Sequence, residues 1–271
     1  MNQGIIRLLV LFLMTMAVEK SAAQSWDVGM LAGGAGYMGD LNPDKPYVMN
    51  NLAYGLFVAR DFDGNWLLKL SVTHGKISAA DSNSHNPAQI ERNLSFFSPV
   101  TEISGRLEFN FFNYIPAVSR KRYTPYIFAG GGLVLFNPKA RSPEGDVVEL
   151  NPLGTEQSQL DIYGTYRKYA ITVPFGAGIK YNVASVWSLG FELGYRTAFT
   201  DYLDDVSGRY PDFSRLDRNE ENQLRLEMSD RSVLRNAPWT QRGDFRPRDS
   251  YFFTGITLTY TFLSRKCPPV R

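Results

Sequence analysis

The sequence is poor in cysteine and histidine, on which disulfide scaffolds and many catalytic or zinc sites depend. Among its 271 residues it has one cysteine, Cys267, and two histidines, His74 and His85. A single cysteine cannot form an internal disulfide, and neither a zinc-ligand spacing nor a phosphate-binding glycine loop is present. A hydrolase needs a nucleophile or an activated water beside a base, which two isolated histidines do not provide. The sequence therefore predicts a protein that is not an enzyme and that holds no cofactor or metal.

Long apolar runs in the body of the chain and a strong excess of charge of one sign are also lacking. Mean hydropathy is −0.25 and charged residues make up 21% of the chain, which excludes a helical membrane protein. The formal net charge of +2 gives no indication of nucleic-acid binding, so no nucleic-acid partner is expected. Aromatic residues, by contrast, reach 14%, as in barrels with aromatic girdles and equally in exported soluble sheets.

The N-terminus has the pattern of a secretory signal peptide. Arg7 supplies one positive charge, residues 8–18 are largely apolar, and small residues end at Ala23. The apolar stretch is too short for a transmembrane helix, and no stop-transfer segment follows it. No cysteine stands at the expected cleavage point, so a lipid-anchored mature N-terminus is not expected. These features predict a signal peptide at residues 1–23 and one exported domain at residues 24–271.

Alternation of apolar and polar residues is the dominant pattern of the mature chain. In its last segment Ile256, Leu258 and Tyr260 fall on one face of an extended strand, and Thr257 and Thr259 fall on the other. One amphipathic strand fits any half-exposed sheet, but here the pattern recurs. Most of the segments are long enough to cross a bilayer, for which about 9–11 residues suffice. The segments with strand character are residues 26–38, 52–62, 66–77, 97–112, 123–136, 169–182, 186–200 and 250–263.

The connections between these segments alternate in length. Short links at residues 61–65, 113–122 and 182–185 alternate with long ones at 39–51, 78–96, 137–168 and 201–249. An outer-membrane barrel with both termini in the periplasm has this form, whereas a soluble sandwich has no reason to gather its long loops at one end. We therefore predict an all-β fold, an eight-stranded antiparallel up-and-down transmembrane β-barrel with short periplasmic turns and long extracellular loops. It would lie in the outer membrane, in contact with lipids and lipopolysaccharide.

The polar faces of the predicted strands carry acids and bases in similar numbers. An eight-stranded barrel is just wide enough for its own side chains to fill the interior. We therefore predict an ion-pair network that plugs the lumen; the alternative is a selective pore lined by the same charges. The residues concerned are Lys69, Glu102, Arg106, Glu108, Lys180, Glu192 and Arg196.

The last long connection contains a cluster of carboxylates, Asp201, Asp204 and Asp205. Such a cluster could coordinate a hard cation such as calcium, but its spacing does not match the calcium-loop pattern. We interpret it as a solvated turn with capping aspartates. The segment behind it, up to Asp249, is rich in arginine and acids and contains no lysine, and residues 218–235 have a helix-compatible composition. This segment is expected to form a structured loop cap or to contact lipopolysaccharide phosphates.

Six runs of the mature chain are distinctive when taken together. They are Gly39-Asp-Leu-Asn-Pro43, Arg92-Asn-Leu-Ser-Phe96, Thr124-Pro-Tyr-Ile-Phe-Ala-Gly130, Asn137-Pro-Lys139, Pro152-Leu-Gly-Thr-Glu156 and Asp201-Tyr-Leu-Asp-Asp-Val-Ser207. Their order resembles a family of outer-membrane barrels of Bacteroidetes to which PorG, a component of the type IX protein secretion system, belongs. The resemblance spans nearly the whole mature chain, and its most specific piece is the last run. It implies a barrel in the outer membrane that contacts a periplasmic ring built from the PorK lipoprotein and its partner PorN.

A contact with such a ring would have to involve the short turns and the C-terminal tail. Basic residues occur at both places, namely Arg120, Lys121 and Arg122 in one link and Arg265 and Lys266 in the tail. We predict that they form a basic rim for an acidic partner; the alternative is that they are ordinary surface charges. For the whole protein, the resemblance implies an anchor for the secretion ring. A general structural or adhesive barrel, with its long loops facing other cells, is the alternative.

Overall fold

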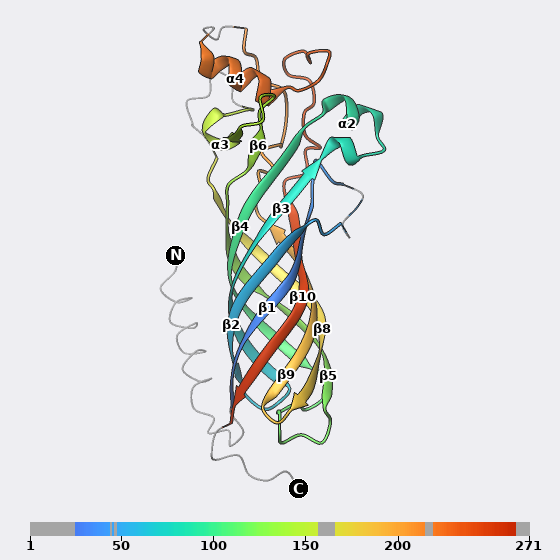
Figure 1. The fold of residues 1–271 in the computed structure, drawn as a ribbon, viewed down its shortest axis with the longest axis vertical. Helices are drawn as coiled ribbons and strands as arrows, with labels where there is room; N and C mark the ends of the chain where they lie inside the picture. The colour runs from blue at the N-terminus through green and yellow to red at the C-terminus, as the bar shows by residue number, and fades with distance from the viewer. Residues whose placement is uncertain (1–24, 44, 46–47, 157–165, 215–218, 264–271) are drawn as a thin grey trace, which may run out of the picture.

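The computed structural model describes residues 25–43, 45, 48–156, 166–214 and 219–263. Within them, eight long strands curve into a barrel, and loops with short helices gather at one end (Figure 1). The barrel strands are β1 (Ser25–Met38), β2 (Asn51–Asp61), β3 (Trp66–Ala80), β4 (Ser95–Asn110), β5 (Tyr123–Phe136), β8 (Tyr169–Ala184), β9 (Trp187–Ala198) and β10 (Ser250–Phe262). Their bounds differ from the predicted ones by at most three residues.

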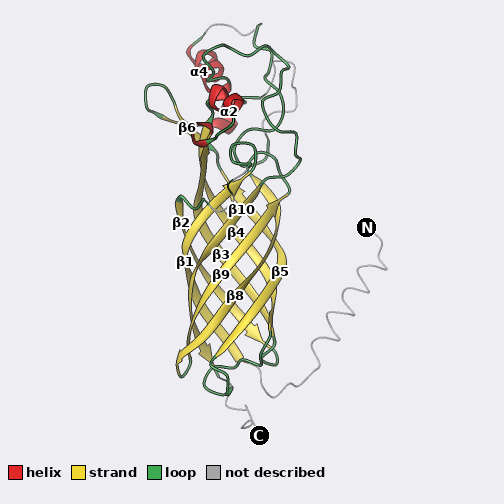
Figure 2. Ribbon diagram, turned by 90° about the vertical axis from the view of Figure 1, so that its right-hand side faces the viewer, coloured by secondary structure: helices red, strands yellow, loops and turns green. Residues whose placement is uncertain are grey.

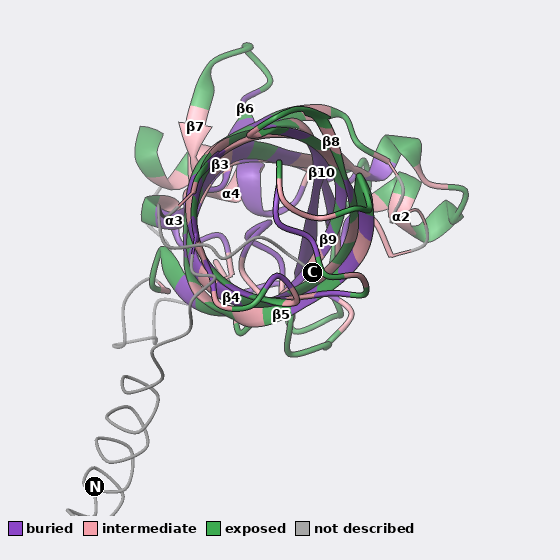
Figure 3. Ribbon diagram, turned by 90° about the horizontal axis from the view of Figure 1, so that it is seen from below, coloured by how far each residue is buried: buried purple, intermediate pink, exposed green. Residues whose placement is uncertain are grey.

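The barrel is closed, and its strands run alternately up and down. Each of the eight long strands pairs antiparallel with the next one along the chain, and β10 returns to pair with β1 over its whole length. Seen from the end with the short turns, the strands form a continuous ring (Figure 3). Closure provides every barrel strand with two neighbours, so the backbone hydrogen bonds are made within the sheet. The predicted eight-stranded antiparallel up-and-down β-barrel is confirmed.

The two ends of the barrel differ in the way the loop lengths predict. Residues 62–65, 111–122 and 185–186 turn at one end, and the long connections all lie at the other (Figure 2). The first short turn is built locally, because Asp61 Oδ1 accepts a hydrogen bond from the Gly64 N–H at 2.6 Å. Gly64 itself has φ = 84°, a backbone conformation that glycine adopts without strain.

Short elements give the long connections a structure of their own. A small hairpin of β6 and β7 extends the sheet beyond β4, where Phe97 lies opposite Lys139. A helix forms inside the segment for which the sequence predicted one. None of the helices in the described segments is long and apolar enough to span a membrane. The elements are η1 (Asp81–Asn83), α2 (Pro87–Arg92), β6 (Lys139–Arg141), β7 (Val147–Glu149), α3 (Leu150–Leu153) and α4 (Glu220–Ser229).

The outer face of the barrel is apolar. Its exposed apolar side chains form a belt around the barrel, which would be unusual for a soluble monomer, because such proteins rarely expose an apolar patch larger than a few hundred Å². At the short-turn end this belt becomes aromatic, where the Trp66 ring packs on Phe109 at 4.8 Å and Trp187 packs on Tyr260 at 5.0 Å. Aromatic rings at this level are typical of a membrane–water interface. Exposed apolar side chains of the belt include Trp26, Met30, Leu56, Leu70, Ile103, Ile127, Ile171, Phe191 and Ile256.

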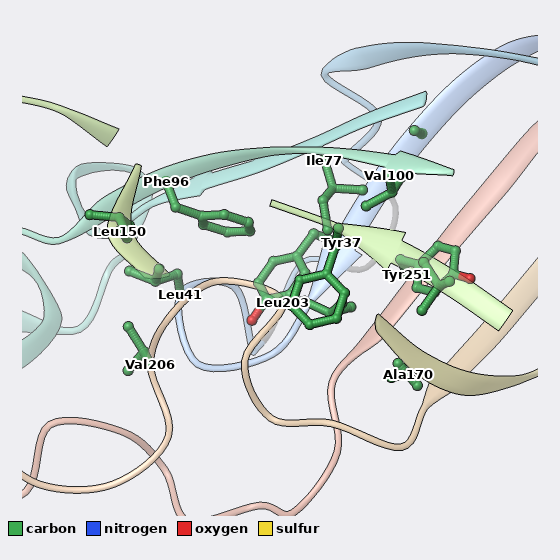
Figure 4. Packing of buried hydrophobic residues seen from close by; sticks show 14 of the residues in the cluster. Tyr37, Leu41, Ile77, Phe96, Val100, Leu150, Ala170, Leu203, Val206 and Tyr251 are labelled. Atoms are coloured by element: carbon green, nitrogen blue, oxygen red, sulfur yellow. The ribbon is translucent and has the colours of Figure 1, made fainter. Parts of the chain in front are cut away.

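A hydrophobic core cluster lies where the strands meet the long loops. Tyr37 of β1 packs edge-on against Phe96 of β4, with ring centroids 4.8 Å apart. Leu203 and Val206 reach the same place from the loop after β9 (Figure 4). All four side chains are buried. The loops therefore pack into the mouth of the barrel, and we call this assembly of loops and apolar side chains the loop cap.

Candidate functional site

Inside the barrel, five of the seven predicted lumen residues form one buried group. Arg106 on β4 donates two hydrogen bonds to Glu192 on β9, at 2.7 and 2.6 Å. Lys69 pairs with Glu108, and Lys180 donates to the other oxygen of Glu108 at 2.7 Å. The strand register places charged side chains of β3 and β4 side by side, since Lys69 lies directly opposite Arg106 in the β3–β4 ladder. These contacts thus join three basic and two acidic side chains across the lumen.

The other two predicted lumen residues pair closer to the loop cap. Arg196 Nε lies 3.2 Å from Glu102 Oε2, and the Tyr251 hydroxyl donates to the same oxygen at 2.7 Å. Arg196 also donates to the Gly194 carbonyl at 2.5 Å. Both charged side chains are at most 2% exposed. Buried charges are tolerated when they are paired and hydrogen-bonded in this way.

Aromatic rings fill the space around the lower charges. The Lys69 ammonium lies 4.3 Å from the centre of the Phe57 ring, and the Lys180 ammonium lies 4.5 Å from that of Tyr126. Room for the Tyr126 ring depends on Gly178, because a Cβ at this position would lie 2.5 Å from it. The lumen is therefore packed with side chains toward the short-turn end of the barrel and covered by the loop cap at the other end.

The loop cap is held together by Arg242. Its guanidinium donates to Glu156 Oε1 at 2.8 Å, to the Asp205 carbonyl at 2.7 Å and to the Ser229 carbonyl at 3.1 Å. These three partners come from three separate segments of the long loops. Since one buried arginine satisfies acceptors from all of them, it fixes the loops relative to one another.

The interpretation of the carboxylate cluster as a solvated turn is wrong for Asp204 and Asp205, whereas Asp201 is half-buried. Asp204 and Asp205 are each 1% exposed, because the turn packs down into the mouth of the barrel instead of facing water. The Tyr37 hydroxyl donates to Asp204 at 2.6 Å, and Ser207 donates to Asp201 at 2.7 Å. Burial raises the pKa of the Asp205 carboxyl to about 6. These aspartates are structural parts of the loop cap.

Four of the six distinctive runs meet in the loop cap. Arg92 donates to the Asp40 carbonyl at 3.0 Å, which joins the first run to the second. Glu156 accepts the Ser207 N–H at 2.9 Å, which joins the fifth run to the sixth. The sequence contains no local signal for this meeting, because the contacts join residues that are far apart in the chain. Most of the runs that carry the resemblance thus contribute to one shared structure.

The basic residues of the β4–β5 link lie at the opposite, short-turn end. Arg120, Lys121 and Arg122 are all exposed, and we call them the basic turn. The Lys121 ammonium lies 3.4 Å from the centre of the Phe112 ring, which fixes part of the turn against the barrel end. Arg265 and Lys266, predicted to join the same rim, lie outside the described residues.

The two histidines occupy separate places. His74 on β3 forms a hydrogen bond of 2.9 Å between its Nδ1 and Thr101 Oγ1. His85 is exposed between η1 and α2. Their surroundings are those of ordinary polar residues in a strand and in a loop.

A closed barrel with an apolar belt, an aromatic girdle and a charged, packed interior is a transmembrane β-barrel of the outer membrane. The short turns and the joined ends of β1 and β10 then face the periplasm, and the loop cap faces outward. Within this class, the chain belongs to the family described as a domain of unknown function, DUF6089, which matches residues 6–223.

Comparison with solved structures finds other outer-membrane barrels at low identity. A major outer membrane protein of Thermus thermophilus is 13% identical, with a TM-score of 0.45, covering 89% of this chain and 100% of that one. The attachment invasion locus protein Ail of Yersinia pestis is 10% identical, with a TM-score of 0.38 and coverage of 89% and 98%. OprG of Pseudomonas aeruginosa is 9% identical, with a TM-score of 0.39 and coverage of 89% and 95%. The comparison with curated proteins gave no match.

Proposed function

We propose that this protein is a sealed, non-enzymatic outer-membrane anchor of the PorG type, which holds the periplasmic ring of a type IX secretion system against the membrane. The observation that carries the proposal is the filling of the barrel at two levels. Ion pairs such as Arg106–Glu192 occupy the lumen, and the loop cap covers its mouth. A barrel filled in this way is suited to anchoring a partner rather than to passing a solute.

The periplasmic surface available to such a partner is small. Stable interfaces bury about 1,200–2,000 Å² in total, more than one short turn can supply. We therefore place the contact on several turns together with the C-terminal tail, with the basic turn as its charged part. An acidic surface on a PorK or PorN ring would complement it, and complementary charge increases both association rate and specificity.

Reversal of the basic turn to glutamate at all three positions tests the proposal. Tagged protein is purified under mild conditions from native outer membranes, and co-purifying periplasmic ring components are quantified by mass spectrometry. The proposal predicts a clear loss of ring components from the variant. A matched control reverses three exposed basic residues at the outer end, Arg141, Arg167 and Lys168, and should leave recovery unchanged. Equal recovery from both variants would exclude the basic turn as a contact.

The outer loops support a second candidate function, a structural or adhesive barrel. Val233 and Leu234, in the loop behind α4, are 94% and 74% exposed, and Trp239 is also exposed. Exposed apolar residues at a loop tip are a common basis for contact with another surface. Under this alternative, native membranes would yield lipopolysaccharide and abundant porins but no ring components, and a Val233→Ser/Leu234→Ser variant would lose attachment to cells.

A further inference from the structure

Three aspartates meet at the outer ends of three neighbouring strands. Asp40 follows β1 by two residues, Asp249 directly precedes β10, and Asp201 follows β9 by three residues. The three strands are adjacent in the barrel. Each aspartate offers a carboxylate oxygen, and these oxygens all lie within 4.8 Å of one another. The barrel topology itself therefore assembles the group, which we call the aspartate triad.

Among the described residues no ion pair joins the aspartate triad to a lysine, arginine or histidine, and the cation that Asp40 acts on at longer range is Arg92. Arg92, the arginine that reaches the Asp40 backbone, is bound by its guanidinium to Asp81 at 2.8 and 2.7 Å. Asp40 and Asp249 are 3% and 1% exposed. Like charges gathered away from water are unfavourable without compensation.

One oxygen of the aspartate triad stands out. Asp40 Oδ1 accepts a hydrogen bond from the Asp244 N–H, whereas Asp40 Oδ2 is buried and accepts none from the described chain. Buried acceptors in proteins are almost always satisfied, because an unsatisfied one costs about 1–3 kcal/mol, and more when it is charged. A buried carboxylate oxygen beside two other carboxylates, with no donor facing it, has the electrostatic setting of a cation ligand.

We propose that Asp40, Asp201 and Asp249 bind a hard divalent cation, and that Ca²⁺ is the ion the site suits. Ca²⁺ takes oxygen ligands at about 2.3–2.6 Å in flexible geometry, so ligand oxygens up to about 5 Å apart can share it. Mg²⁺ demands a nearly ideal octahedron, which three aspartates from separate loops are less suited to provide. Asp40 also lines a surface cleft together with Asp244 and Gln241, which gives the ion a route from outside.

Protonation is the other way for the aspartate triad to lose its repulsion. Burial raises the pKa of Asp40 to about 9, and burial raises that of Asp201 to about 6. A bound divalent cation would instead hold the carboxylates in their charged form. It would also tie the loop after β1 to both ends of the loop between β9 and β10, at the seam where the first and last strands of the barrel close.

Calcium binding by the full-length protein tests the proposal. The protein is purified in detergent without lipopolysaccharide, treated with a chelator and titrated with Ca²⁺, and bound calcium is measured by elemental analysis. We expect one Ca²⁺ per chain. Asp40→Asn and Asp201→Asn should each weaken binding by about tenfold or more, since each removes a charged ligand. Asp146→Asn, which changes an exposed carboxylate of the β6–β7 hairpin, should leave binding unchanged.

Trypsin provides a readout of the loop cap itself, because the connection between β9 and β10 is rich in arginine. Ca²⁺ should slow its cleavage several-fold in the wild-type protein and in Asp146→Asn, and not in Asp40→Asn. Heat-modifiable gel migration verifies that each variant is a folded barrel. If Asp40→Asn does not fold, Asp201→Asn takes its place in the trypsin experiment. Absence of saturable Ca²⁺ binding at millimolar concentration, or equal binding by wild type and both variants, would overturn the proposal.

Discussion

Breaking the Arg106–Glu192 pair should destabilise the barrel strongly, provided that the lumen is dry. The pair forms two hydrogen bonds of 2.7 and 2.6 Å, and its side chains are 4% and 0% exposed. A fully uncompensated buried charge costs about 3–5 kcal/mol. Here the remaining member keeps one weaker neighbour, since Lys69 lies 4.0 Å from Glu192 and Glu108 lies 3.3 Å from Arg106, so the cost falls at the lower end, about 3 kcal/mol. We therefore expect Arg106→Met and Glu192→Leu each to lower the free energy of unfolding by that amount.

The double variant separates this mechanism from ordinary packing defects. Replacement of both members of a buried ion pair by apolar residues of similar size is often neutral. Arg106→Met/Glu192→Leu should therefore lie within about 1–2 kcal/mol of the wild type, with a coupling energy of about 4 kcal/mol or more in magnitude. Urea unfolding in lipid vesicles, followed by fluorescence of the exposed Trp26 and Trp187, measures all four proteins.

An exposed pair provides the control. Lys139 and Glu149 are 2.8 Å apart at the outer end, with side chains 26% and 41% exposed. Exposed pairs are worth about 0–1 kcal/mol, so Lys139→Met should change stability by no more than that. If Arg106→Met also cost under about 1 kcal/mol, water would be screening the lumen charges, and the reasoning that the barrel is sealed would be refuted.

Further predictions concern the packing, conductance and loop cap. Gly178→Val should prevent folding or strongly reduce stability, since its Cβ would lie 2.5 Å from the Tyr126 ring. Gly131→Val, with open space around its Cβ, is the control and should fold normally. Heat-modifiable gel migration measures the folded fraction of both. Wild-type protein in planar bilayers should show no steady ohmic steps, and regular unit conductance would contradict a filled lumen. Arg242→Ala should speed proteolysis of the outer loops several-fold while the barrel stays intact, because three loop contacts are lost. Arg246→Ala is the control, since the Arg246 side chain is exposed.

The barrel could be predicted from the sequence because strand alternation is a local, periodic signal. Once Lys69, Arg106 and Glu192 are assigned to inward positions, closure of so narrow a barrel brings them together. Their individual partners could not be predicted, since these depend on register. The bidentate contact of Arg106 with Glu192, for example, crosses the lumen between β4 and β9.

A structured loop cap is one of two expectations for the last long connection, but its contacts could not be predicted, because the loops have no comparable periodicity. Asp204 and Asp205 have the composition of an exposed turn, and only the packing of distant segments buries them. The same applies to the meeting of Asp40 with Asp249, which are separated by almost the whole mature chain and become neighbours through the pairing of β1 with β10. Such contacts follow from tertiary packing and barrel closure rather than from local sequence preference.

Site-specific photocrosslinking in living cells tests the central claim most directly. A photoreactive phenylalanine analogue replaces Lys121 in the basic turn or, in a second strain, Arg141 at the outer end, both of which are exposed. After irradiation, the anchor proposed here should form adducts with periplasmic ring proteins from position 121 and none of these from position 141. Adducts found only at position 141, or adducts at position 121 that contain no periplasmic ring protein, would contradict the anchor proposal. The outer loops would then be the functional surface.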